Sequence, residues 1–243
     1  MLFDNKQNFL NLYFYSLIKG DCMITNMFTP TDYKNSGFDL VHRTWRKISV
    51  STTVFDEDKF MHSFYRGYMN RPSIRISKRT TTVADPLIDV LLSSRVPSFT
   101  NYDINLIRFG HRLSMGAENI IGLLLEEYIH QNIIELGWSC CWGNSISSVD
   151  FCSSTGLLIQ VKNKSNTENS SSNKIRMGTD IKKWYRMKAS TGETCWDELN
   201  HTIGAKELLS EQKFREFVTL TVKKNPSLLY LDTQEFDLVF PNN

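Results

Sequence analysis

The clearest pattern of hydrophobic positions in this chain is a helical one between residues 111 and 136. Apolar residues recur there with the i, i+3, i+4, i+7 spacing of an amphipathic helix, at positions 117, 120, 121, 124, 125, 128 and 129. Ser114 is placed to cap the start of this helix, and Gly137 is placed to end it. The pattern therefore predicts a long helix near the middle of the chain.

Directly after this helix, the pattern changes to short extended segments. Residues 138–142, 146–152 and 157–162 are apolar or alternating, and turns containing Gly and Ser separate them. Consecutive extended segments joined by tight turns pair as antiparallel neighbours. The sequence therefore predicts a helix that leads into a three-stranded antiparallel meander.

The segments after the meander are predicted from the same kind of pattern. Residues 174–188 and 203–218 carry apolar side chains at helical spacing, and each stretch therefore predicts a helix. Three shorter apolar runs predict closing strands or extended segments, at residues 218–222, 228–231 and 236–240. The polar run at residues 163–173 predicts an exposed loop.

Residues 1–110 have no single dominant pattern. Amphipathic stretches at 10–17 and 55–68 are separated by prolines, which predicts short helices joined by turns. The fold class expected for the whole chain is mixed α/β. We expect one domain over residues 1–243, with a mostly helical part at 1–110, a core at 111–222 and a C-terminal extension at 223–243.

The composition excludes several classes of protein. With 243 residues, 41% hydrophobic and 22% charged, the chain can bury a sizeable core and is not a disordered or low-complexity sequence. The five cysteines are odd in number and form no CxxC pair, which predicts reduced thiols and no disulfide framework or zinc site. No signal peptide and no apolar stretch of roughly 18 residues is present, so we expect a cytoplasmic protein.

Three polar residues of the meander are predicted to lie together at one edge of the sheet. Asp150 lies in the second extended segment, and Gln160 and Lys162 end the third. Strand alternation puts positions 160 and 162 on one face, and the intervening turn folds Asp150 back opposite them. Phosphodiester hydrolysis needs this combination, because it requires oxygen ligands for Mg²⁺ and a cation near the nucleophile and the developing charge.

The same short pattern occurs at two other places. Asp39 precedes Glu-Asp-Lys at 57–59, and Asp197 precedes Glu-Gln-Lys at 211–213. Both triplets lie where the spacing of apolar residues is helical, so they lack the strand context of Asp150. A half-buried strand whose Gln and Lys merely face solvent is the alternative to a site at Asp150.

The long helix adds a fourth candidate. If it runs antiparallel to the first strand, its N-terminal end returns to the edge of the sheet where Asp150 and Lys162 are expected. We therefore expect Glu118 as a supporting metal ligand, and we expect Glu126, Glu127 and Glu135 to lie turns away.

The charge of the chain is concentrated around this predicted site. The chain has a net charge of +2, but residues 157–188 contain eight cations against two carboxylates, so this segment carries +6 and the remainder −4. Such a cluster, next to an Asn- and Ser-rich loop, favours contacts to phosphates and base edges, whereas a solvated basic face is the alternative. The DNA-binding candidates are Lys164, Asn166, Asn169, Ser170, Ser171, Ser172, Lys174, Arg176, Lys182, Lys183 and Arg186.

A second basic run lies at residues 71–79. It alternates cations with apolar residues like an exposed strand. Two interpretations of this run stay open: it is a second surface that contacts DNA, or it is an ordinary surface segment.

These residues resemble the PD-(D/E)XK nuclease superfamily, and more narrowly type II restriction endonucleases of the SinI/AvaII type. The resemblance rests on Val149-Asp150 and on residues 158–173, 178–186 and 191–196, within about residues 110–200. It implies a restriction-endonuclease-like core, which is a central mixed sheet flanked by helices. It also implies Mg²⁺ as cofactor, with Asp150, Gln160 and the Val161 backbone carbonyl as ligands and Lys162 acting on the attacking water.

The resemblance further implies what the protein acts on. Its expected substrate is double-stranded DNA, cut to leave 5′-phosphate ends at a short site such as a GGWCC-like sequence. The expected assembly is a homodimer, with a cognate DNA methyltransferase as genetic companion.

The sequence departs from the superfamily pattern at two positions. Val149 stands where the motif has Pro, and Gln160 stands where it has Asp or Glu, which removes one negative charge from the metal site. Two other functions stay open. One is a structure- or damage-specific DNA repair nuclease on the same core, and the other is a DNA-binding module without catalysis.

Overall fold

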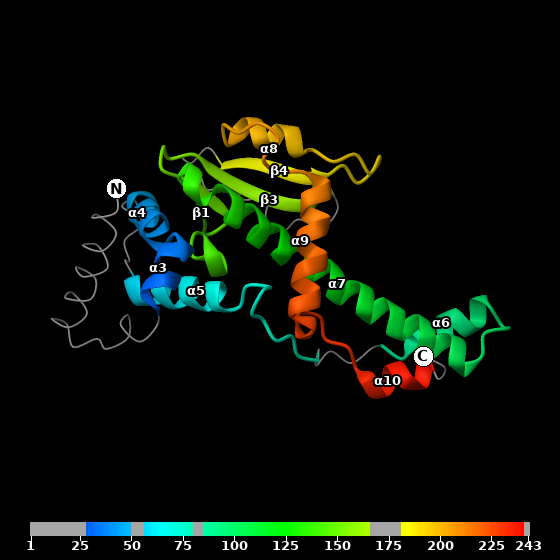
Figure 1. Cartoon of the computed structure of the whole chain (residues 1–243). Coiled ribbons are helices and arrows are strands. Elements are labelled where there is room, and N and C mark those ends of the chain that lie inside the picture. Colours follow the sequence, from blue (N-terminus) through cyan, green and yellow to red (C-terminus); the bar gives the residue numbers. More distant parts are fainter. Residues whose placement is uncertain (1–27, 50–55, 80–84, 166–180, 241–243) are drawn as a thin grey trace. The chain divides into compact units, whose positions relative to one another are not determined.

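The computed structural model describes residues 28–49, 56–79, 85–165 and 181–240 (Figure 1). None of the helices in these ranges is long and apolar enough to cross a membrane. The chain forms two compact units. The first unit comprises the described parts of Met1–Arg71 and Leu125–Phe217, and the second comprises those of Pro72–Leu124 and Val218–Asn243.

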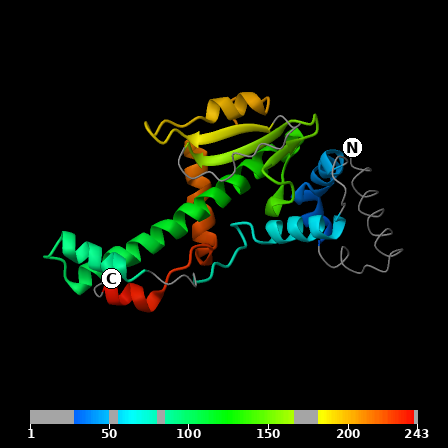
Figure 2. The ribbon, with the colours of Figure 1, turned by 180° about the vertical axis from the view of Figure 1, so that it is seen from behind.

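The first unit contains a four-stranded sheet, visible from both sides in Figures 1 and 2. Its strands lie in the order β1 (Trp138–Cys140), β2 (Phe151–Ser153), β3 (Leu158–Lys164) and β4 (Ile181–Met187). The first three strands pair antiparallel, which confirms the predicted meander. The fourth pairs parallel to β3, so the sheet is mixed. The predicted mixed α/β class is therefore confirmed.

The helix predicted at residues 174–188 is wrong in its described part. Residues Ile181–Met187 form strand β4, because the exposed edge of β3 supplies a backbone partner along its length. The prediction at residues 203–218 is shifted, since two helices are present, α8 (Trp196–Thr202) and α9 (Glu211–Lys224). The predicted closing strands are also wrong. Their residues fall in or next to α9, the 3₁₀ turn η3 (Pro226–Leu228) and helix α10 (Thr233–Val239).

The long central helix α7 spans Asn101–Ile133 and continues into the 3₁₀ turn η1 (Ile134–Leu136). It begins ten residues before the predicted start, so Ser114 is not its cap. Thr100 and Asp103 cap it instead: the Asp103 N–H donates to the Thr100 hydroxyl (3.3 Å), and the Thr100 N–H donates to the Asp103 carboxylate (2.8 Å). Gly137 ends the helix as predicted, in the left-handed conformation (φ 78°).

Three short helices precede the second unit. They are α3 (Pro30–Ser36), α4 (Phe38–Ser49) and α5 (Glu57–Met69). A buried cluster of stacked and edge-on aromatic rings joins them, formed by Phe28, Tyr33, Phe38, Phe60, Phe64 and Tyr68. The second unit contains α6 (Leu87–Arg95), the N-terminal part of α7, the end of α9 and α10, and Phe109 packs on Phe236 and Phe240 there.

Helix α5 is held against the 3₁₀ turn η2 (Trp142–Asn144) by a contact between two glycines. A Cβ atom added at Gly67 would lie 2.1 Å from the Gly143 nitrogen, and one added at Gly143 would lie 1.9 Å from the Ser63 carbonyl oxygen. The Ser63 hydroxyl donates to the Gly143 carbonyl (2.6 Å). Only glycine at both positions allows the two backbones to approach this closely.

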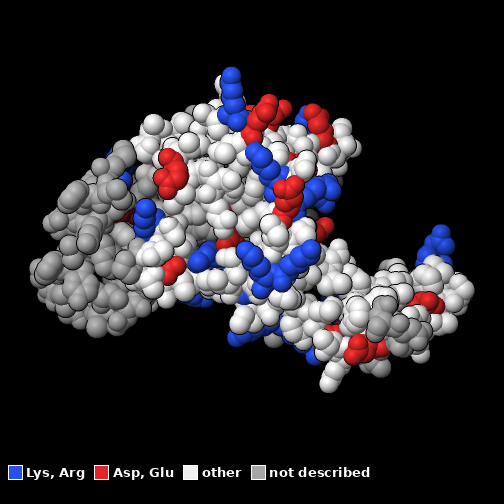
Figure 3. Space-filling view, viewed as in Figure 1, with Lys and Arg blue, Asp and Glu red and all other residues white. Residues whose placement is uncertain are grey.

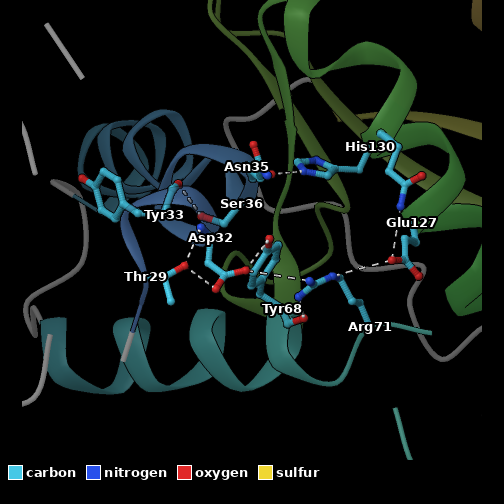
Figure 4. A network of polar contacts seen from close by, with 10 residues as sticks. Thr29, Asp32, Tyr33, Asn35, Ser36, Tyr68, Arg71, Glu127 and His130 are labelled. Carbon is cyan, nitrogen blue, oxygen red and sulfur yellow. Dashed lines mark hydrogen bonds and ion pairs between the residues drawn. The ribbon is translucent and has the colours of Figure 1, made fainter. Parts of the chain in front are cut away.

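A network of polar contacts joins α3, α5 and α7 beside this contact (Figure 4). The Arg71 guanidinium lies 3.6 Å from the Glu127 carboxylate, 3.9 Å from the Asp32 carboxylate and 3.9 Å from the centre of the Tyr68 ring. Glu127 is almost fully buried, so this ion pair supplies the opposite charge that a buried carboxylate requires. The pair fixes the rotation of α7 about its axis near Glu127.

His130 extends the network toward the sheet. Its Nε2–H donates to the Asn35 carbonyl (2.8 Å), and its Nδ1 accepts from the Cys140 N–H (3.2 Å). These two contacts define a neutral imidazole with the proton on Nε2. Burial lowers the pKa of His130 to about 4, opposed by the Asn35 hydrogen bond and reinforced by the positive charge of Arg71.

Gly67→Ala is expected to destabilise the protein by about 1–3 kcal/mol, because the added methyl forces α5 away from η2. Gly110→Ala is the matched control: Gly110 lies in α7 with no atom within 4 Å of its added Cβ, so alanine should be neutral or stabilise by up to about 1 kcal/mol. Urea unfolding monitored by circular dichroism measures both effects. Equal stability of the two variants would contradict the close contact.

The free energy of unfolding should contain a contribution from His130 that depends on pH. Its folded-state pKa lies below that of the unfolded chain, so this contribution is complete above pH 6.5 and is lost as the pH falls toward 4. The loss amounts to up to about 3 kcal/mol. The stability difference between wild type and His130→Gln, measured by urea unfolding at several pH values, should shrink over this window. A constant difference would show that His130 titrates normally in the folded protein.

Candidate functional site

Asp150 is held by hydrogen bonds to the strands on both sides of it. Its backbone N–H donates to the Ile159 carbonyl (2.9 Å), and its carbonyl accepts from the Cys141 N–H (2.8 Å). One oxygen of its carboxylate accepts from the Val161 N–H (2.7 Å). The position of the carboxylate is therefore fixed by the backbone of the meander and does not depend on a flexible loop.

The sheet brings Asp150, Gln160 and Lys162 together on one face. Phe151 pairs with Ile159, so Asp150 lies opposite Gln160 one position further along. Side chains alternate along β3, which places Lys162 on the same face as Gln160. Gln160 is buried and Lys162 is half-buried. The two rival triplets at 57–59 and 211–213 lie in α5 and α9, as the sequence indicated.

A carboxylate of α7 completes this cluster, and it is Glu126. Burial and the neighbouring charge of Asp150 raise the pKa of Glu126 to about 8, while the positive charge of Lys162 acts in the opposite direction. Burial also raises the pKa of Asp150, against the Val161 N–H and Lys162, which lower it. Two acidic groups and one cation thus influence one another at this edge of the sheet.

The expectation that Glu126 lies turns away from Asp150 is therefore wrong, and Glu126 takes the position expected for Glu118. Glu118 is exposed and belongs to the second unit. The cause is the difference in rise between helix and strand. The chain advances about 13 Å over the four residues from Gly137 to Cys141, whose N–H donates to the Asp150 carbonyl. About nine helical residues cover the same distance. Asp150 therefore lies level with the helix turn around Glu126.

One signal in the sequence points to Glu126. It lies three and seven residues before Ile129 and Ile133, on the side of the helix that is buried. A carboxylate at such a position is unusual in a structural helix, because burying its charge costs free energy unless a partner or a function compensates.

The donor atoms of this cluster fit a divalent cation that prefers oxygen ligands. Glu126 and Asp150 supply carboxylate oxygens, and Gln160 can supply its amide oxygen. The charge of Asp150 helps to raise the pKa of Glu126, and a bound Mg²⁺ would favour the ionised form of both carboxylates. Among the described residues, no group of three or more His, Cys, Asp and Glu side chains could hold a metal ion.

The predicted DNA-binding residues separate into three sets. Seven of them lie outside the described residues: Asn166, Asn169, Ser170, Ser171, Ser172, Lys174 and Arg176. Lys164 lies exposed at the end of β3. Lys182, Lys183 and Arg186 lie on β4, and the predicted helical face that was to unite them does not exist.

Arg186 is a structural residue in this arrangement. It is buried, donates to both carboxylate oxygens of Glu211 (2.7 and 2.8 Å) and donates to the Asn163 side chain (2.8 Å). Its guanidinium is thus paired within the protein, and its contact to the DNA backbone stays a prediction. Lys188 likewise pairs with Glu193 (2.7 Å). In Figure 3, Lys and Arg side chains stand among Asp and Glu side chains over α8 and α9. Part of the local charge of +6 is balanced, because Lys182, Arg186 and Lys188 each pair with a glutamate.

The second basic run does not form a strand. Arg71 is held by Glu127 and Asp32, and the Ser77 N–H donates to the Ser227 carbonyl (2.9 Å) within the second unit. Arg71 is thus paired within the protein, and both interpretations of the basic run stay open.

The cysteines described by the structure are free thiols, as predicted. Cys140, Cys141 and Cys152 are buried beside the Asp150 cluster, and Cys195 is partly exposed. Burial raises the pKa of Cys141, and a hydrogen bond with Cys152 adds to this effect. Burial raises the pKa of Cys140 as well, whereas the hydrogen bond with Cys141 lowers the pKa of Cys152.

Comparison with known proteins identifies the relatives of this chain. The family model of the SinI restriction endonuclease matches residues 40–224. Over 145 residues the chain is 43% identical to the type II restriction enzyme Eco47I of Escherichia coli, which covers 57% of this chain and 61% of that enzyme. Over 150 residues it is 40% identical to the type II restriction enzyme SinI of Salmonella infantis, covering 59% and 64%. Each match thus spans less than two thirds of the relative.

Glu126→Gln is expected to become more stable relative to wild type as the pH rises. The folded-state pKa of about 8 lies above that of the unfolded chain, so the contribution of Glu126 to stability is present near pH 4.5 and is lost as the pH rises through 8. Between pH 5.5 and 9 the stability difference should change by at least about 1 kcal/mol in favour of the variant. Chemical denaturation without divalent metal measures this difference. Glu135→Gln, at an exposed position of η1, is the matched control. A stability difference for Glu126→Gln that does not change with pH would contradict the cluster.

Proposed function

Because this chain belongs to the SinI restriction endonuclease family, we propose that it is a type II restriction endonuclease, which hydrolyses phosphodiester bonds of double-stranded DNA at a specific sequence. The observation that carries this proposal is the cluster of Glu126, Asp150 and Lys162 around the start of β2 and the end of β3. The relatives Eco47I and SinI are named type II restriction enzymes, which supports the same activity here.

In this proposal, Mg²⁺ is held by Glu126, Asp150, the Gln160 amide oxygen and the Val161 carbonyl oxygen. The cation would supply positive charge that polarises the scissile phosphate and favours deprotonation of the attacking water. The backbone of β3 orients Asp150 through the Val161 N–H, so its carboxylate faces the substrate with little reorganisation. Gln160 contributes a dipole in place of a charge, which lowers the negative charge of the site by one.

Lys162 has the second role in the reaction. Its ammonium lies on the same face as Asp150 and Gln160, where it can hold the attacking water and the developing negative charge of the phosphate. Water attacks phosphorus, and the bond between phosphorus and the 3′ oxygen breaks. The 3′ oxygen takes a proton, so the products are a 5′-phosphate and a 3′-hydroxyl.

Cutting both strands of a duplex requires two such reactions. One chain carries one cluster, so a homodimer would place one cluster at each strand. The resemblance further predicts a GGWCC-like recognition site, a companion DNA methyltransferase that protects it, and a cytoplasmic location. All of these assignments presuppose the nuclease activity, which the cleavage assay tests.

Incubation of the purified chain with unmethylated phage DNA and Mg²⁺ should give discrete fragments. Asp150→Asn, which keeps an oxygen for the Val161 N–H, and Lys162→Met should each slow cleavage at least about 100-fold, while binding to the same DNA is retained. Glu126→Gln should do the same, and Glu135→Gln should cut at the wild-type rate.

Three other outcomes would contradict parts of the proposal. A smear or cleavage restricted to damaged or branched DNA would indicate a repair nuclease. Specific binding without nicking in Mg²⁺ or Mn²⁺ would indicate a DNA-binding module. Loss of cleavage in Glu118→Gln with full activity in Glu126→Gln would return the helix carboxylate to the position that the sequence predicted.

A further inference from the structure

Arg71 lies two residues past the end of α5, and its side chain is held on several sides. Its Nη1–H donates to the Tyr68 carbonyl (2.8 Å), and its guanidinium lies 3.9 Å from the centre of the Tyr68 ring. From this position its Nε lies 3.6 Å from the Glu127 carboxylate of α7 (Figure 4). The end of α5 therefore orients the guanidinium toward α7.

Glu127 depends on this positive charge because it lies almost wholly out of water. Its side chain is 1% exposed, against 18% for that of Arg71. Removing one partner of a buried ion pair is costly, because the other charge stays buried with less to balance it. Without Arg71, α7 gains free energy by turning Glu127 toward water.

Any turn of α7 at Glu127 moves Glu126 as well. The two residues are adjacent in one helix, so the directions of their side chains stay about 100° apart. Glu126 is the carboxylate that lies beside Asp150 and Lys162 in the cluster. The direction in which Glu126 projects therefore depends on the partner of Glu127, although Arg71 is not a member of the cluster.

A second contact holds the same side of α7. His130 lies three residues after Glu127, and residues at this spacing share a helix face. It donates to the Asn35 carbonyl (2.8 Å) and accepts from the Cys140 N–H (3.2 Å). These contacts keep α7 attached to α3 and β1 when Arg71 is removed, so we expect a local rotation around Glu127 and not the loss of the fold.

We propose that Arg71 is a positioning residue for the metal site: by pairing with Glu127 it holds Glu126 toward Asp150, which raises the affinity of the site for a divalent cation. This inference rests on the proposed function, because it concerns the cation of that site. Groups that orient a metal ligand from behind typically change metal affinity about 10- to 100-fold.

A double-mutant cycle of Arg71→Met and Glu127→Gln tests this proposal. Binding of Mn²⁺ in place of Mg²⁺, without DNA, is measured from the loss of the electron paramagnetic resonance signal of the free ion. Arg71→Met should weaken Mn²⁺ binding about 10-fold. The double variant has no carboxylate left unbalanced at position 127, so its affinity should return to within about twofold of wild type.

Two further measurements separate positioning from a general loss of structure. Arg108→Met is the matched control, because Arg108 pairs with Asp89 (2.9 Å) in the second unit, and it should bind Mn²⁺ like wild type. In the cleavage assay, Arg71→Met should need more Mg²⁺ for half-maximal cleavage, while its rate at saturating Mg²⁺ stays close to that of wild type. A partly unfolded protein would cut more slowly at every Mg²⁺ concentration.

The outcomes separate this inference from the function on which it rests. Three results overturn the role of Arg71 while wild-type cleavage still supports the nuclease: unchanged Mn²⁺ binding in Arg71→Met, an equal loss in Arg108→Met, or a double variant that binds as weakly as Arg71→Met. Wild-type protein that binds no Mn²⁺ and cuts no DNA overturns both. Mn²⁺ binding that follows the cycle in a protein that cuts no DNA supports Arg71 and overturns the nuclease.

Thermal unfolding of every variant is measured alongside. If Arg71→Met does not fold, the double variant is compared with Glu127→Gln, since loss of Arg71 should have no effect once position 127 is neutral. Equal Mn²⁺ affinity of these two variants supports the proposal, and a further loss in the double variant overturns it.

Discussion

The position of the cluster of Glu126, Asp150 and Lys162 depends on the reversal of the chain at Gly137. This glycine ends α7 in a left-handed conformation and sends the chain back along the helix as β1. A strand advances more than twice as far per residue as a helix, so the short β1 reaches the level of Glu126 before the chain turns into β2. The meeting of Glu126 and Asp150 is thus a consequence of the length of β1, and the meander then brings Gln160 and Lys162 to the same place.

Two consecutive glutamates of α7 serve different purposes because they project in directions about 100° apart. Glu127 is neutralised by Arg71 and fixes the helix against the N-terminal helices. Glu126 faces Asp150, and the repulsion and burial of these two groups raise its pKa. The ion pair of Glu127 and Arg71 is complete within the protein. Glu126 and Asp150 repel each other when both are ionised, and a bound cation can relieve that repulsion.

The sequence predicted the parts of this arrangement that depend on neighbours in the chain. Gly137, the turn near Gly156 and strand alternation were sufficient for the meander and for the common face of Asp150, Gln160 and Lys162. Strand β4 could not be predicted locally, because its partner β3 is reached across residues 165–180 and its own pattern suits a helix. The pairing of Arg186 could not be predicted for the same reason, since Glu211 lies 25 residues further on. Glu118 was expected in place of Glu126, but a helix rises less than half as far per residue as a strand, which places Glu126 at the level of Asp150.

The contact between Gly67 and Gly143 has a consequence for how the protein folds. The hydrogen bond from Ser63 to Gly143 closes a loop of 80 residues, whereas α7, β1, β2 and β3 follow one another along the chain. Closing long loops costs more entropy and slows the formation of a contact. We therefore expect α7 and the meander to assemble first, with the carboxylates of the cluster already close together. The N-terminal helices would then dock onto an existing surface, as a late step that locks the rotation of α7.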